Sequence, residues 1–527
     1  MSARLDRRIV IAALVAVLAT PASAQDPARF DEIFGRWSGD RPGCTLGVER
    51  PGAPPMMRSW GLAELEHRVQ AAPSTIYEAG SVSKQFTAAA ILLLVDDGRL
   101  GLDDDVRRWL PELPDYGRTI TIRHMLNHTS GLRDWGSVVA LEGWPRGSRA
   151  MEQSQVLEVV ARQRVLNFEP GTEWLYSNSG YNLAAIIVAR VSGQSFADFT
   201  RDRLFAPLGM TQTRWRDDYT AVVSSRAAAY APAADGYRHA MPFENAHGNG
   251  GLLTTVGDLL AWNRALTEGR LGLSERLAQP GSAAGRSTHY GLGLERGVNE
   301  GQAEIAHSGS TGGYRSWLAR YPDHGLSIAL LCNTADANPE MLGRQVASLF
   351  LPDPPELLTY VPADPAPEGL FASARTGEPF GLRMTPQGLV VIPGGRLLIP
   401  VGPDVWRLGG EEIRFEGSDR FVRITEDGDR IVHERREPVA PNPEALAVYA
   451  GDYVSDEAQA RWTLRVIDGR LALDRGGQPP VVLAPTYLDG FAAPGFVLRF
   501  DRNLSGEVTT LHVNAGRARD VVFNRIP

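Results

Sequence analysis

Lysine is almost absent from this chain of 527 residues. Lysine and arginine together number 54, and Lys84 is the single lysine among them. Arginine supplies charge and salt bridges, but its guanidinium keeps its proton in a protein, whereas a lysine amine can be tuned to lose one. An amine that carries protons is therefore the simplest reason for a lysine at this one position.

Cysteine and basic charge are also scarce. Cys44 and Cys332 are the only cysteines, each in an apolar, strand-like segment, and they are either two buried thiols or one disulfide of an oxidising compartment. The ten histidines show no H-E-x-x-H or similar spacing, so we predict neither a metal site nor another cofactor. A net charge of −8 without a basic, aromatic-rich cluster argues against a nucleic-acid partner.

Long apolar runs are confined to the start of the chain. Residues 1–24 have the form of a signal peptide, with three arginines in the first eight residues, an apolar stretch and Ala22-Ser23-Ala24 before Gln25. No cysteine follows the expected cleavage site, and no second apolar run is long enough to cross a bilayer. We therefore expect an exported protein, periplasmic or secreted from a bacterium, without a membrane anchor.

The lone lysine lies at the start of a predicted helix. An apolar run over Ala88–Val95 ends near Asp97-Gly98, where glycine suits the position after a helix. Ser81 and Lys84 stand three residues apart, which places both on one face of the first turn. The pair indicates an activated nucleophile and its base. The alternative, a helix cap beside a surface charge, is less favoured because the sole lysine occupies this spacing.

Two further short motifs carry groups suited to the same chemistry. Tyr176-Ser177-Asn178 is the one Y-x-N in the chain, and a phenol beside an amine can relay protons while a carboxamide holds a substrate amide. His307-Ser308-Gly309 ends a predicted strand, where the backbone beyond the glycine can approach a substrate. The glycine-rich segment 248–251 fits no phosphate-binding motif and reads as a tight connection beside the site.

His124 and His128 stand one helical turn apart, as two metal ligands would. No third donor accompanies them, so we favour a structural role for both.

Composition divides the chain into a mixed α/β part and an all-β tail. We expect an α/β domain over 25–350, a proline-rich linker over 351–368 and short antiparallel strands beyond it. The tail reads as a duplication with a repeat of 82 residues, which predicts two small β-barrel-like domains over 369–440 and 441–527. The matched positions are Gly369, Phe371, Leu382 and Arg383 with Gly451, Tyr453, Leu464 and Arg465.

The three motifs S-x-x-K, Y-x-N and H-x-G occur in the order seen in the penicillin-recognising serine hydrolases. The chain resembles this family (peptidase family S12), which comprises class C beta-lactamases, D,D-peptidases, related esterases and D-aminopeptidases, over about residues 35–350. The resemblance implies a beta-lactamase/transpeptidase-like fold, an antiparallel sheet flanked by helices with a helical subdomain.

The resemblance also implies roles for the catalytic groups. Ser81 would be the nucleophile that forms an acyl-enzyme, and Lys84 and Tyr176 would share the work of general base and acid. No cofactor is implied.

Substrate binding would fall to the second and third motifs. Asn178 would orient the substrate carbonyl, and His307 would replace the lysine of the K-T-G form ahead of Gly309. The backbone N–H groups of Ser81 and Ser310 would form the oxyanion hole.

A histidine in place of lysine in the third motif, at His307, argues against a typical beta-lactamase. The tail is similar to that of D-aminopeptidases. Local similarity to that family extends over 81–87, 130–134 and 453–457. In those enzymes a loop of the last barrel enters the cleft and selects a free amino terminus. The candidate loop here is Asp474-Arg475-Gly476-Gly477-Gln478, in which Asp474 is the acid.

We therefore expect an exported serine hydrolase of D-amino-acid-containing peptides or amides, similar to D-aminopeptidase. A D,D-carboxypeptidase or an esterase of the same family stays open, as do beta-lactams as ligands and the oligomeric state. A non-catalytic receptor for peptidoglycan fragments is a further alternative, against which the intact Ser81, Lys84 and Tyr176 weigh. No G-x-S-x-G elbow supports an α/β-hydrolase.

Overall fold

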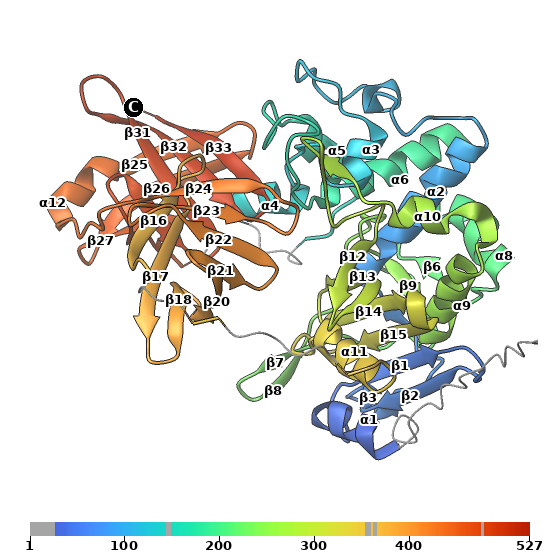
Figure 1. Ribbon diagram of the computed structural model, residues 1–527. Coiled ribbons are helices and arrows are strands. Elements are labelled where there is room, and N and C mark those ends of the chain that lie inside the picture. The colour runs from blue at the N-terminus through green and yellow to red at the C-terminus, as the bar shows by residue number, and fades with distance from the viewer. Residues whose placement is uncertain (1–26, 144–148, 354–359, 362–365, 476–478, 527) are drawn as a thin grey trace, which may run out of the picture.

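The protein consists of an α/β part and two β-barrels. The computed structural model describes residues 27–526 apart from 144–148, 354–359, 362–365 and 476–478. Figure 1 shows the α/β part in blue to yellow, with the two barrels, in orange and red, side by side against it. The predicted signal over 1–24 and much of the predicted linker lie outside the described residues.

A six-stranded antiparallel sheet forms the centre of the α/β part. Its order, β12-β13-β14-β15-β1-β2, joins the first strands of the domain to its last ones. All seven residues of β15 are buried, because α9 covers one face of the sheet while α11 and α1 cover the other. The strands are β12 (Glu295–Asn299), β13 (Gln302–Thr311), β14 (Tyr314–Tyr321), β15 (Leu326–Cys332), β1 (Cys44–Glu49) and β2 (Met56–Trp60).

A helical subdomain packs beside this sheet. Its central helix, α2, spans Lys84–Asp96, and eleven of its residues are buried, as expected for a helix that is apolar on all sides. It ends as the sequence predicts, with Gly98 in the left-handed region at φ 68°. The helix packs most closely on α6. The remaining helices of the α/β part are α1 (Pro27–Phe34), α3 (Ile122–Leu126), α4 (Trp135–Leu141), α5 (Gln153–Ala161), α6 (Asn178–Ser192), α7 (Phe196–Thr200), α8 (Ala206–Leu208), α9 (Val256–Thr267), α10 (Ser274–Ala278) and α11 (Pro339–Ser348).

Short strand pairs complete the α/β part. One three-stranded sheet, β5-β9-β6, brings Glu78 beside the glycine-rich segment 248–251. The short strands are β3 (Leu62–Glu64), β4 (Val69–Gln70), β5 (Tyr77–Glu78), β6 (Arg214–Trp215), β7 (Tyr230–Ala233), β8 (Gly236–His239), β9 (Leu252–Thr254), β10 (Ser282–Ala283) and β11 (Arg286–Ser287). Among the described residues, no helix combines the length and apolarity needed to cross a bilayer.

The strand predicted to end at His307 continues to Thr311. His307 pairs with Leu318, and the pairing goes on until Thr311 meets Tyr314. Ser308, Gly309 and Ser310 are therefore strand residues, because pairing with β14 overrides their weak local preference for a strand.

The tail forms two nearly closed, nine-stranded antiparallel sheets with the same strand order. Equivalent positions carry the same register: Gly369 pairs with Leu382 and Gly451 with Leu464. The first sheet comprises β16 (Gly369–Ser373), β17 (Pro379–Thr385), β18 (Gly388–Ile392), β19 (Arg396–Leu397), β20 (Ile399–Gly402), β21 (Val405–Leu408), β22 (Glu411–Phe415), β23 (Arg420–Ile424) and β24 (Arg430–Arg435). Helix α12 (Pro443–Leu446) precedes the second, which comprises β25 (Gly451–Ser455), β26 (Ala460–Ile467), β27 (Arg470–Asp474), β28 (Val481–Val482), β29 (Ala484–Pro485), β30 (Gly490–Ala493), β31 (Phe496–Arg502), β32 (Val508–Ala515) and β33 (Ala518–Arg525).

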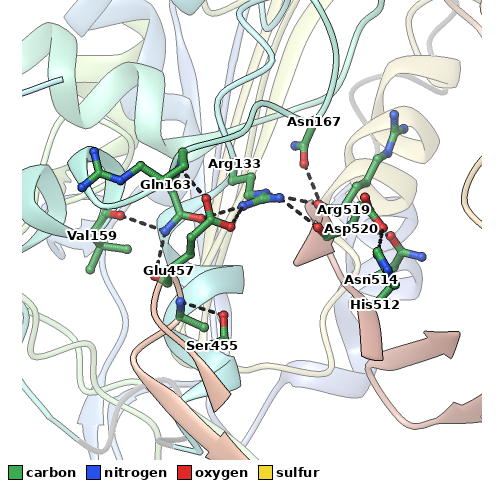
Figure 2. A network of polar contacts seen from close by, with 12 residues as sticks. Arg133, Val159, Gln163, Asn167, Ser455, Glu457, His512, Asn514, Arg519 and Asp520 are labelled. Carbon is green, nitrogen blue, oxygen red and sulfur yellow. Dashed lines mark hydrogen bonds and ion pairs between the residues drawn. The ribbon is translucent and has the colours of Figure 1, made fainter. Parts of the chain in front are cut away.

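The second barrel is anchored to the helical subdomain by a buried arginine. The Arg133 side chain has 0% exposure, and its guanidinium lies 2.8 Å from the Glu457 carboxylate. It also donates to the backbone oxygens of Arg519 and Asp520 at 3.1 and 3.0 Å and to Gln163 at 3.1 Å (Figure 2). The segments 130–134 and 453–457 are therefore the two sides of one interdomain contact.

A disulfide joins the first and last strands of the central sheet. Cys44 and Cys332 lie opposite one another on β1 and β15 and are bonded to each other. This resolves the alternative that the sequence left open.

We expect the double variant Cys44→Ala/Cys332→Ala to lose about 2–5 kcal/mol of unfolding free energy, because the cross-link restricts a very long loop in the unfolded chain. Thermal melts with and without reductant measure this. The wild type should melt lower in reductant and the variant should be insensitive to it. Identical melts of reduced and oxidised wild type would contradict the prediction.

Candidate active site

Ser81 and Lys84 meet at the junction of a 3₁₀ turn and helix α2. The turn spans Gly80–Ser83, and α2 begins at Lys84 without a break. The Lys84 Nζ lies 3.0 Å from the Ser81 Oγ. Ser81 is half-buried at the surface of the cleft, whereas Lys84 has 0% exposure behind it. The spacing of three residues therefore produces the contact that the sequence predicts.

Two other oxygens hold the Lys84 amine. Nζ donates to Asn178 Oδ1 at 2.9 Å and to the backbone oxygen of Asn249 at 2.7 Å. An amide oxygen and a carbonyl oxygen can only accept, whereas a serine hydroxyl can also donate. Of these three partners, Ser81 alone has a proton that it could pass to Lys84.

Tyr176 lies beside this pair at the wall of the cleft. Its ring centroid is 4.8 Å from Lys84 Nζ, and its side chain lines the cleft with Ser81. Burial raises the pKa of the Tyr176 phenol well above its usual range, against which a hydrogen bond with Ser81 acts. The resting phenol is therefore protonated and able to donate.

A histidine ring and a barrel turn support the loop that carries Tyr176. The backbone N–H of Ser177 donates to His128 Nδ1 at 3.2 Å, and the His128 ring packs at a tilt against that of Tyr176, with the ring centroids 4.3 Å apart. The Trp174 N–H donates to Asp429 of the first barrel at 2.9 Å. His124 Nδ1 accepts from the Thr121 N–H at the start of α3. Both histidines of the predicted pair thus hold backbone groups, and among the described residues no three histidine, cysteine or acidic side chains gather as metal ligands.

His307 is neutral and fully engaged. Its Nδ1 lies 2.6 Å from the Ser308 carbonyl oxygen and its Nε2 lies 2.8 Å from the Tyr290 hydroxyl. Because the carbonyl only accepts, Nδ1 carries the proton and Nε2 accepts from Tyr290. Burial and the nearby Lys84 lower the pKa of His307 to about 3. The residue that would replace a lysine therefore adds no positive charge.

Two glycines let strand β13 press against the turn of Ser81. A Cβ on Gly309 would lie 2.1 Å from the Ala79 oxygen and 2.2 Å from Ser316 Oγ, and one on Gly80 would lie 2.6 Å from the Ser310 nitrogen. Any side chain at either position would push the strand away. The glycines thus bring the Ser310 N–H next to the Ser81 turn, where an oxyanion would need it.

The cleft in front of Ser81 has a volume of about 650 Å³, within the range of small-molecule sites. It brings together the predicted Ser81, Tyr176, Asn178, His307, Gly309 and Ser310. Sequence reasoning missed Glu295 on β12, Glu340 at the start of α11 and Arg517 from the last hairpin, all of which line the cleft. No motif marks them, because only the fold brings them to Ser81. Asn249, whose backbone oxygen accepts from Lys84, had one signal in the sequence: it lies in the glycine-rich segment 248–251.

Among the described residues, the second barrel reaches the cleft at Arg517, and the gating role of the loop 474–478 stays a prediction. Asp474 lies at the end of β27, 3.9 Å from Arg465, and Arg475 lies over Phe496 and against Ala140. Neither lines the cleft, and residues 476–478 lie outside the described residues.

Known proteins are similar in sequence to this chain over nearly its whole length. A D-aminopeptidase of Gluconobacter oxydans is 29% identical over 96% of this chain and 99% of its own. Penicillin-binding protein 4* of Bacillus subtilis is 32% identical over 52% of this chain and 64% of its own. D-amino acid amidase from Ochrobactrum anthropi SV3 has the same fold, with a TM-score of 0.54, 24% identity, and coverage of 62% of this chain and 97% of its own. The family model described as Beta-lactamase matches residues 11–349, more than half of the chain, and the protein therefore belongs to the beta-lactamase family.

Proposed function

We propose that the protein is an exported, D-stereospecific amide hydrolase of the D-aminopeptidase type, which works through an acyl-enzyme on Ser81. The observation that carries this is the Lys84 amine, which lies 3.0 Å from Ser81 Oγ and also donates to the acceptor oxygens of Asn178 and Asn249. The names of its relatives, D-aminopeptidase and D-amino acid amidase, support the substrate class. The predicted signal over 1–24 supports export.

The first step is acylation of Ser81. The neutral amine of Lys84 takes the hydroxyl proton as Ser81 Oγ bonds to the carbonyl carbon of the substrate. Negative charge develops on the carbonyl oxygen, and the N–H groups of Ser81 and Ser310 stabilise it. Asn178, bonded to Lys84 through its Oδ1, keeps its amide N–H groups available for a substrate carbonyl.

Collapse of the tetrahedral adduct expels the amine. The amine needs a proton, and Tyr176 is placed to supply it, because it lines the cleft while Lys84 is sealed behind Ser81. The proton taken up by Lys84 then passes to the Tyr176 oxygen, which restores the phenol. Water then attacks the acyl-enzyme by the same groups in reverse, which releases the acid.

An aminopeptidase also needs an anion for the substrate ammonium. Of the three acids that line the cleft, Glu78 is paired with Arg216 at 2.9 Å and Glu340 with Arg344 at 2.6 Å. No ion pair to Glu295 occurs among the described residues. Glu295 is therefore the acid we assign to the free amino group, in place of Asp474.

Ser81→Ala, Lys84→Arg and Lys84→Met should each abolish turnover, by at least about a thousandfold, because each removes nucleophile or base. Matched D- and L-alanyl p-nitroanilides, a p-nitrophenyl ester and a chromogenic cephalosporin are the substrates. The wild type should prefer the D-anilide. Circular dichroism checks that the variants fold.

Substantial activity of Lys84→Arg would remove the proton-transfer argument. Cleavage of the ester alone would indicate an esterase. No turnover of any substrate by the wild type would favour a binding protein.

Gly309→Ala should lower kcat by about 100- to 1,000-fold, because the added methyl displaces the Ser310 N–H from the oxyanion. Gly297→Ala is the control, since a Cβ at that glycine of the neighbouring β12 meets no atom within 4 Å. Equal kcat for Gly309→Ala and wild type would place the oxyanion hole elsewhere.

The kcat/KM for substrates with a free amino group should rise with pH through about 7. Burial raises the pKa of Glu295 to about 7, helped by Glu340 and Glu426 and opposed by His289 and Arg344, so the carboxylate that binds an ammonium forms only above that pH. Glu295→Gln should remove this rise, and N-acetylated substrates should lack it. An unchanged profile in Glu295→Gln would assign the ammonium to another group.

A further inference from the structure

Three arginines line the cleft within the described part of the chain. Two have their guanidinium groups engaged: Arg216 donates to both Glu78 oxygens at 2.9 and 3.1 Å, and Arg315 donates to the Gly312 and Tyr314 carbonyls at 2.9 and 2.8 Å. The third, Arg517, makes no guanidinium hydrogen bond to any described residue. It therefore presents a full set of donors to the cleft.

The nearest acid to Arg517 does not satisfy this guanidinium. Asp134 lies 3.8 Å from it, beyond hydrogen-bond distance. The two oxygens of Asp134 already accept the backbone N–H groups of Asn178 at 2.8 Å and Ser137 at 3.1 Å. The Arg517 side chain is 43% exposed, so an anion in the cleft can reach it.

The backbone of Arg517 is held in place from both sides. Its N–H donates to Ser137 Oγ at 3.0 Å, and its carbonyl accepts from Asn167 Nδ2 at 2.9 Å. The other end of the Asn167 amide accepts from the Arg519 N–H at 2.8 Å, beside the Arg133 contact (Figure 2). An arginine on such a fixed loop pays little entropy to bind a ligand.

Arg517 lies against Tyr176, the residue proposed to protonate the departing amine. Its guanidinium carbon lies 4.5 Å from the centroid of the Tyr176 ring. Tyr176 is the proton donor that faces the departing amine, because Lys84 is sealed behind Ser81. The Arg517 guanidinium therefore lies beside the group that would serve the leaving amine, and both residues line the same cleft.

We infer that Arg517 is a specificity residue which binds a carboxylate on the leaving group. The preferred substrates are then peptides whose leaving group is an amino acid with a free carboxylate, because a planar guanidinium matches a carboxylate in two parallel bonds. Simple amides, which release ammonia or a neutral amine, lack this contact. The inference rests on the proposed function and narrows its substrate class.

The experiment compares D-alanyl-glycine with D-alanyl-glycinamide, which differ only in the terminal carboxylate. We expect the wild type to favour the carboxylate form in kcat/KM. Arg517→Gln should lower kcat/KM about 10- to 100-fold for D-alanyl-glycine and less than about threefold for the glycinamide, since only the first loses a charged bond. Arg517→Lys should restore part of the preference.

A matched control separates an effect on carboxylate recognition from an effect on the packing of the second barrel against the helical subdomain. Arg519→Gln alters the same hairpin, but its side chain pairs with Glu173 at 3.0 Å and does not line the cleft, so the ratio between the two substrates should stay at the wild-type value. Equal losses on both substrates in Arg517→Gln would overturn the inference and leave Arg517 as a support for Tyr176 or the barrel. Wild-type kcat/KM on both substrates in Arg517→Gln would overturn it too.

Failure of the proposed function would look different. In that case the wild type would cleave neither peptide nor D-alanyl p-nitroanilide. Cleavage that Ser81→Ala abolishes, with a ratio that Arg517→Gln leaves unchanged, would reject the role of Arg517 alone.

Discussion

The contact between Lys84 and Ser81 is the interaction on which the rest of the site depends. A buried amine is costly unless its protons are matched by acceptors, and here Asn178 and Asn249 supply two of them. These acceptors come from the start of α6 and from the segment between two glycines, so both must be in place before the amine can face Ser81. The apolar α2 then locks the arrangement, since its residues pack on every side.

The side chains that line the cleft include a neutral histidine, an acid and an arginine. His307 is neutral because both ring nitrogens are bonded and buried, so the position where a lysine would stand attracts no anion. Arg517 of the second barrel and Glu295 of the sheet edge also line the cleft, and neither has a charged partner within hydrogen-bond distance among the described residues. One acid and one base in the same cleft are consistent with the proposed recognition of a substrate with two charged ends.

The barrels act on the site through its supporting loops. The turn of the first barrel holds the Trp174 N–H through Asp429 and His289 through Asp427. The second barrel holds the start of α4 through Arg133 and Arg517. Trp174 lies two residues before Tyr176, and Asp134 at the start of α4 accepts the backbone N–H of Asn178. The tail is therefore coupled to the geometry of the second motif, although its own sheets lie outside the catalytic domain (Figure 1).

The sequence alone determined the elements whose signals are local. The spacing of Ser81 and Lys84, the apolar α2 and the 82-residue repeat of the tail are each written in neighbouring residues, and the beta-lactamase family follows from them. Tertiary structure alone decided the rest. Ser308 and Ser310 became strand residues because β14 pairs with them, and Cys44 met Cys332 because the sheet places its first strand beside its last. Glu295 and Arg517 reached the cleft, because which loop of a barrel faces a partner depends on docking contacts such as that of Arg133. Those contacts join residues more than three hundred positions apart, and no local pattern encodes a pairing at that distance.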